Sequence, residues 1–166
     1  MVSHDTASFV GSSGALRRIA GRSENATTST YGLLTEAYFE QVAAKRYDVA
    51  AAVAATTADI CRPRGEPFEK HLAEALYRVA YCGHRIGEPV LEVIEEALAV
   101  LDKHRPDRDP TYASALGLLA VVLSENGQHE AAIDAARRAL DLERALGSAN
   151  VPAARLRLDE VLAAAD

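Results

Sequence analysis

The stretch Ala113–Leu146, ASALGLLAVVLSENGQHEAAIDAARRALDLERAL, decides the fold. Apolar residues recur at helical spacing on both sides of a break at Asn126-Gly127. The second half places small residues, among them Ala132 and Ala136, on its apolar stripe. The stretch therefore predicts two antiparallel helices in close contact. Because such a pair cannot bury its own apolar faces, it also predicts further pairs along the chain.

Similar helical patterns recur through most of the remaining sequence. Polar or Pro- and Gly-containing breaks separate the further expected helices, which span residues 31–45, 47–61, 66–82, 89–101 and 150–164. Residues 83–87 are expected to form a turn, and Asp109 is a good cap for the helix that begins at Pro110. The last helix is expected to direct three apolar residues inward: Leu156, Val161 and Leu162.

Composition favours one all-α domain. Hydrophobic residues make up 49% of the 166 residues, but aromatic residues only 5%, and there is no Trp. A core must then be built from Ala, Leu, Val and Ile, which suits closely packed helices better than a sheet. Two cysteines, Cys61 and Cys82, lie within helical patterns at a spacing unlike that of a metal site. We expect reduced, partly buried thiols, with a disulfide as the alternative.

Charge and hydropathy limit the partners and the location. The formal charge of −6 argues against nucleic acid as a partner, because phosphates would be repelled by most of the surface. The longest apolar run, residues 115–123, is about half the length that a membrane span needs. No apolar segment of the signal-peptide type begins the chain. We expect a cytoplasmic protein that does not enter a membrane. An Ala-rich chain with Arg in large excess over Lys is typical of a GC-rich bacterial genome.

The N-terminal residues 1–29 are rich in Ser, Thr, Gly and Asn and are expected to be a largely disordered tail. One amphipathic segment, residues 13–22, interrupts this composition. It has apolar residues on one helical face and basic residues off that face: Ala15, Leu16, Ile19 and Ala20, against Arg17, Arg18 and Arg22. Two interpretations remain open. The segment is a frayed tail, or it docks onto the acidic body or onto another subunit.

The second helices of the expected pairs share a common register. Tyr47, Gly87 and His129 begin matching patterns, at offsets of 40 and then 42 residues. Self-similarity of this length in helix pairs is typical of an α-solenoid, in which each pair packs on the next. The final helix, with its charged face, is expected to close the array against solvent.

This register resembles that of the tetratricopeptide repeats. The motif spacing is carried by Leu116, Leu119-Ala120, Leu123, Gly127, His129, Ala132 and Ala139-Leu140. The LERALG ending resembles the longer variant of kinesin light chains and of bacterial signalling proteins. The resemblance implies a right-handed α-α superhelix of about three helix pairs and a capping helix, over residues 31–166. The middle pair departs from the pattern, because Arg78 stands where the family has a small residue, and the family's Trp is absent.

The sequence contains none of the common catalytic signatures, so we expect a non-catalytic protein without cofactor or metal. His104, Asp107 and Asp109 have a spacing that could hold a cation, but a polar loop ending in a helix cap explains them more simply.

Binding to a protein or peptide is the function that the resemblance implies, through the concave face lined by the first helix of each pair. The residues expected there, besides Gly117, are Thr35, Phe39, Val42, Ala75, Val79, Cys82, Val121 and Ser124. Because this set is small and apolar, we expect an apolar or helical peptide segment as ligand. Core packing is the alternative role for these residues, above all for Val79 and Val121. Two other functions stay open: a self-associating scaffold, most simply a homodimer, and a regulator that senses a peptide or small ligand.

Overall fold

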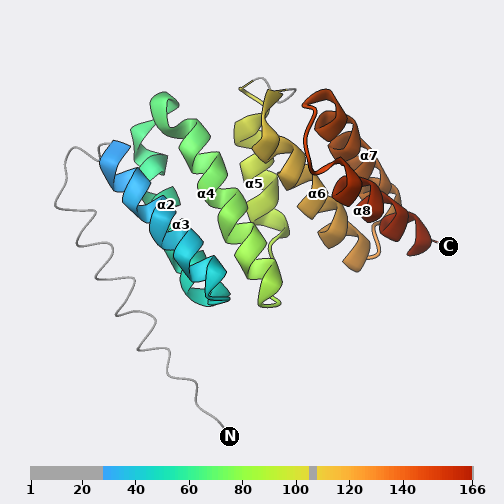
Figure 1. Ribbon diagram of the computed structural model, residues 1–166, viewed down its shortest axis with the longest axis horizontal. Helices are drawn as coiled ribbons and strands as arrows, with labels where there is room; N and C mark the ends of the chain where they lie inside the picture. Colours follow the sequence, from blue (N-terminus) through green and yellow to red (C-terminus); the bar gives the residue numbers. More distant parts are fainter. Residues whose placement is uncertain (1–27, 105–107, 166) are drawn as a thin grey trace, which may run out of the picture.

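The computed structural model describes residues 28–104 and 108–165, which form seven α-helices and a short 3-10 turn and contain no strand (Figure 1). The helices follow one another along the long axis of the molecule. Their bounds are α2 Thr28–Ala43, α3 Tyr47–Cys61, α4 Glu66–Arg85, α5 Leu91–Leu101, α6 Pro110–Glu125, α7 His129–Ala145 and α8 Val151–Ala163, with the 3-10 turn η1 at Arg62–Arg64. The all-α prediction is confirmed for this part of the chain.

Helix ends follow the local chemistry of the sequence. Proline occupies the first turn of α4, α6 and α8, where its missing N–H has no intrahelical partner to lose. Asp109 caps α6 as expected, since its side chain accepts a hydrogen bond of 2.8 Å from the backbone N–H of Thr111. Gly127 has a φ of +74° in the turn between α6 and α7, a backbone conformation that favours glycine. The break at Asn126-Gly127 is thus confirmed.

Two local predictions are wrong. Helix α4 continues to Arg85, so Gly83 lies within the helix and is buried. An ideal Cβ on Gly83 would lie 2.7 Å from Val90 Cγ1, so the glycine marks a close approach of chain segments. In α8, Leu156 and Leu162 are exposed, while Ala154 and Val161 are buried. Ala154 and Val161 are seven residues apart, so they lie on the same face of α8. This face, and not the one that carries the two leucines, packs inward.

Packing proceeds from each helix to the next. Consecutive helices contact one another from α2 to α8, and α6 also contacts α4 and α8. The largest core cluster joins α4, α5, α6 and α7 around the fully buried Ile94, Leu101 and Leu116. Burying a side chain of this size stabilises the fold by about 1.5–3 kcal/mol. Buried alanines, such as Ala73 and Ala80 on α4, let the helix axes approach closely.

No helix within residues 28–104 and 108–165 is long and apolar enough to cross a membrane. The predicted tail up to residue 27, with its amphipathic segment 13–22, lies outside the described residues. Helix α2 begins at Thr28, three residues before the expected start. Residues 105–107, which include Asp107 of the cation-like spacing, also lie outside them.

Candidate functional site

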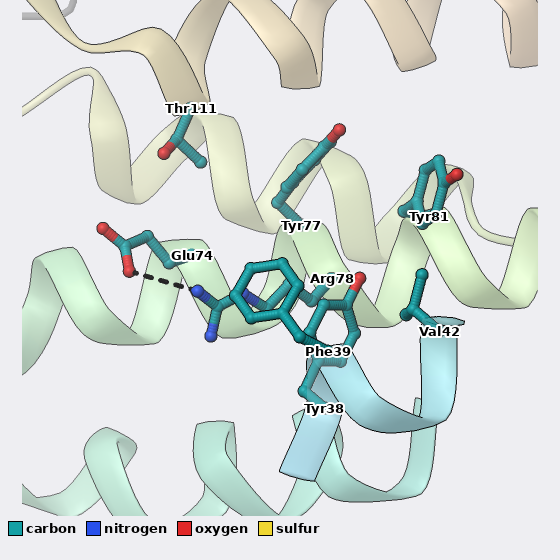
Figure 2. Close-up of a pocket in the computed structure, with 8 residues that line it drawn as sticks. All are labelled: Tyr38, Phe39, Val42, Glu74, Tyr77, Arg78, Tyr81 and Thr111. Atoms are coloured by element: carbon teal, nitrogen blue, oxygen red, sulfur yellow. Dashed lines mark ion pairs between the residues drawn. The ribbon is translucent and has the colours of Figure 1, made fainter. Parts of the chain in front are cut away.

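A pocket of about 440 Å³ lies between α2 and α4, beside the first turn of α6. Its volume falls within the range of pockets that hold small organic ligands. Helix α2 contributes Tyr38, Phe39 and Val42, and Thr111 belongs to α6. Figure 2 shows the side chains that line it from α4: Glu74, Tyr77, Arg78 and Tyr81. We call this site the aromatic pocket.

Among the described residues, Arg78 is the only cation that lines the aromatic pocket, and neighbouring side chains hold it on several sides. Its guanidinium carbon lies 5.1 Å from the ring centroid of Tyr38 and 5.3 Å from that of Phe39. Each cation–π contact at a partly buried site contributes about 1 kcal/mol. Arg78 Nη1 donates a 3.2 Å hydrogen bond to Thr35 Oγ1, and Nη2 lies 3.9 Å from Glu74 Oε2. These contacts fix a charged side chain that is only 15% exposed.

Glu74 compensates the charge of Arg78 and links α4 back to the start of α2. Its Oε2 accepts a hydrogen bond of 2.5 Å from the hydroxyl of Tyr31. Burial, with that hydrogen bond as the next cause, raises the pKa of Tyr31 to about 12. The tyrosine therefore stays neutral and keeps donating at ordinary pH. The pocket consequently holds one positive and one negative charge. Two hydrogen bonds join α2 to α4, one between Tyr31 and Glu74 and the other between Thr35 and Arg78.

Aromatic residues are concentrated at this pocket. The chain has six Tyr and three Phe, and four of the eight that the structure describes line the pocket. Phe39 leaves 56% of its surface exposed, although it is one of the largest apolar side chains in the protein. Aromatic rings are enriched where proteins contact partners, since they offer a large contact area at a low cost in conformational entropy. The concentration therefore favours a binding surface over simple core packing.

Tyr38 lines the pocket, and Cys82 contacts this tyrosine from the core. Tyr38 is buried, and the thiol of Cys82 donates a weak hydrogen bond of 3.7 Å to its hydroxyl oxygen. Burial, the largest cause in each case, raises the pKa of the Tyr38 hydroxyl, of the Cys82 thiol and of the Cys61 thiol. Both cysteines are free, and both are buried, whereas the sequence predicted partial burial. A buried thiol with a raised pKa is a poor nucleophile at neutral pH.

Three of the expected binding residues belong to this site. Phe39 and Val42 line the aromatic pocket. Thr35 does not line the pocket, but it accepts a hydrogen bond from Arg78, which does. These three positions are the part of the sequence-based surface that the structure brings together.

The residues expected from α4 are placed differently. Ala75 and Cys82 have no exposed surface, so the expectation that they line a surface is wrong. Val79 is partly buried against the core formed by α2 and α3. The residues that do line the pocket from α4 lie one position earlier than each expected residue: Glu74, Arg78 and Tyr81. One position rotates a helical side chain by about 100°, enough to move a residue from the surface into the core.

The expected surface on α6 is separate from the aromatic pocket. Val121 and Ser124 line a small hollow of about 100 Å³ together with Arg157 and Glu160 of α8. The Arg157 guanidinium also lies directly against Gly117. Helix α8 thus covers this part of α6, and the continuous surface expected across three helix pairs is interrupted.

Sequence reasoning missed five pocket residues, on α2, on α4 and at the start of α6: Tyr38, Glu74, Tyr77, Tyr81 and Thr111. Arg78 was noted only because it breaks the repeat pattern. One feature of the sequence could have indicated the site: Tyr77 and Tyr81 lie one helical turn apart in a chain with few aromatic residues. Their side chains indeed pair, with ring centroids 6.4 Å apart.

The loop before α6 is held by polar contacts with α4. His104 Nε2 lies 2.7 Å from Glu69 Oε2, and Asp109 Oδ2 lies 3.6 Å from Lys70 Nζ. His104 and Asp109 therefore point to different partners on α4. Within the described residues, no group of three or more His, Cys, Asp or Glu side chains is arranged to hold a metal ion.

The sequence was also compared with protein families and with curated proteins. No family model matches the chain, and no curated protein matches it.

Proposed function

We propose that this protein is a non-catalytic interaction module in which a short tetratricopeptide-like array binds a peptide segment of a partner protein. The resemblance of the sequence to that repeat motif supports the array, as does the packing of each helix on the next. The cytoplasm is the location that we expect. A right-handed superhelix is the arrangement that the resemblance implies.

The aromatic pocket is the observation on which this proposal rests. It combines an exposed ring, that of Phe39, with the half-buried rings of Tyr77 and Tyr81 and the side chain of Val42. The charges of Arg78 and Glu74 largely cancel within it. Such a lining gains most from burying apolar groups of the ligand, because its two charged residues compensate one another. A helical peptide that presents apolar residues three or four positions apart suits this surface.

Selection from a random peptide library tests the proposal. Peptides selected on the purified chain should carry Leu, Ile or Phe at helical spacing. Phe39→Ala should weaken their binding by at least about tenfold, because a buried aromatic anchor contributes about 2 kcal/mol. Leu33→Ala is the matched control, since Leu33 is also exposed on α2 but does not line the pocket. Selected peptides that bind Phe39→Ala as tightly as the unaltered chain would contradict the proposal.

Self-association is the second candidate function, and exposed apolar residues near both ends of the described helices favour it. Leu33 on α2 is 64% exposed, and Leu156 on α8 is 59% exposed. Contact between such surfaces in a second copy would bury both residues. Light scattering over a concentration series separates the two functions. A mass that stays at one chain, 17.7 kDa, at every concentration would rule the scaffold out.

A further inference from the structure

The exposed edge of α2 beside the aromatic pocket is acidic. Glu36 and Glu40 flank Phe39 on this edge, and all three residues are exposed. Neither glutamate forms an ion pair with a described residue. An occupant of the pocket therefore meets apolar rings in the centre and, along one side, two carboxylates that have no ion-pair partner among the described residues. The best complement is a segment that is apolar on one face and basic beside it.

The chain itself contains a segment of this chemistry. Residues 13–22, SGALRRIAGR, carry Leu16 and Ile19 on the apolar face of a helical pattern. The basic residues lie off this face: Arg17, Arg18 and Arg22. Residues 13–22 contain no acidic residue, whereas the chain as a whole has a formal charge of −6. Charge complementarity thus favours contact between this segment and the rest of the protein.

The connection between segment and pocket is long enough. Residues 21–27 separate Ala20 from the start of α2, and seven extended residues span up to about 25 Å. Phe39 lies eleven residues beyond Thr28, which corresponds to about 16 Å along the helix axis. The segment can therefore fold back along α2 and reach Phe39 without any change in the helices.

From this complementarity and this reach, we infer that residues 13–22 occupy the aromatic pocket of their own chain and compete there with the partner peptide. Leu16 and Ile19 contact Phe39, Val42 and Tyr81, while the arginines lie against Glu36 and Glu40. The inference rests on the proposed function, since it assigns the same site an internal ligand.

With competition of this kind, the apparent affinity for a partner equals the intrinsic affinity multiplied by the fraction of time that the pocket is open. A short linker holds the segment at an effective concentration of the order of millimolar, so even weak intrinsic binding keeps the pocket mostly occupied. An occupancy of about nine-tenths would weaken partner binding about tenfold. The segment would thereby act as an autoinhibitory contact that only a sufficiently strong partner displaces.

Paramagnetic relaxation in the full chain tests the contact directly. A thiol-reactive spin label modifies the cysteine of Ser13→Cys selectively, because Cys61 and Cys82 are buried. The label should broaden the backbone amide signals of Val42, Arg78 and Tyr81, and L16D/I19D should abolish this broadening. Absence of broadening in the labelled chain would overturn the inference. The second arm mixes a ¹⁵N-labelled chain that carries no spin label with a spin-labelled ¹⁴N chain. Broadening in this mixture would also overturn the inference, since the occupant would then come from a second copy.

A binding measurement tests the competition. The probe is a fluorescein-labelled synthetic peptide of residues 12–23, added to the full-length chain. L16D/I19D should bind this probe about tenfold more tightly than the unaltered chain does. S3D/T6D is the matched control, because it adds the same charge outside residues 13–22 and should bind like the unaltered chain. Equal affinities for all three chains would overturn the inference.

The two proposals can fail separately. Library-selected peptides that bind the unaltered chain and L16D/I19D equally, and that lose affinity with Phe39→Ala, would leave the peptide-binding function intact and refute the internal ligand. If no library peptide binds, the proposed function fails, while the spin-label experiment still decides whether the segment docks.

Discussion

The substitution Gly83→Ala tests the close approach between the end of α4 and the residues that lead into α5. In a helix interior, alanine is more favourable than glycine by about 1 kcal/mol. At this position, however, the new Cβ would lie 2.7 Å from Val90 Cγ1, about 0.7 Å inside an ordinary contact. Val90 is buried and its rotamer is stiff, so it cannot swing away easily.

Overpacking of this kind costs about 1–3 kcal/mol. The backbone cannot relieve it readily, because the carbonyl of Gly83 accepts hydrogen bonds from the N–H groups of Ile86 and Glu88. The overpacking cost therefore exceeds the gain in helix propensity, and we expect Gly83→Ala to destabilise the protein by about 1 kcal/mol. For a chain of this size, the loss lowers the melting temperature by about 2–4 °C.

Urea unfolding followed by circular dichroism at the helical band measures the effect without requiring Trp. The matched control is Gly32→Ala in α2, where an added Cβ meets no atom within 4 Å. The same chemical change should stabilise that helix by about 0.5–1 kcal/mol. Equal stabilisation by both substitutions would refute the packing argument, because only the contact with Val90 distinguishes the two sites.

Three further predictions concern the caps, the ion pairs and the last helix. Asp109→Ala should lower the free energy of unfolding by about 0.5–2 kcal/mol, because the α6 cap is lost. Asp109→Asn should retain most of the capping contribution, and urea unfolding compares the two variants. A hydrogen bond from His104 lowers the pKa of Glu69 below 4.5, so Glu69 stabilises the fold above that pH and loses this contribution as the pH falls through the lowered pKa. Glu69→Gln should therefore flatten the acid side of a stability profile measured from about pH 6 to about pH 3; an unchanged profile would contradict the assignment. Leu156→Glu should change stability by less than about 0.5 kcal/mol, while Val161→Glu, which buries a carboxylate, should cost several times more in the same assay.

Local patterns in the sequence predicted the helices well. Helix α3 has the expected bounds, 47–61, and the break at Asn126-Gly127 and the cap at Asp109 lie where expected. Periodicity, proline and capping residues act over one or two turns, so they can be recognised without the rest of the structure. Gly83 was misassigned as part of a turn because a glycine that permits close contact has the same sequence signal as one that ends a helix.

The candidate site depended on information that a single sequence does not contain. Phe39 and Val42 were predicted from the repeat resemblance, which places them on the concave face of the first helix, and here the expected register agrees with the surface that lines the pocket. Helix α4 is buried on most of its circumference, and the resemblance to a repeat motif placed its surface one residue too late. Only the packing of α4 against α2, α3 and α5 determines which narrow strip stays accessible.

By itself, the sequence determined an all-α chain and the number and approximate bounds of its described helices. These properties follow from periodicity and composition, which are local. The tertiary structure alone decided that the guanidinium of Arg78 lies against the rings of both Tyr38 and Phe39, and that Arg157 covers Gly117. These contacts join residues about 40 positions apart on different helices, and a rotation of one helix by a single residue would replace them.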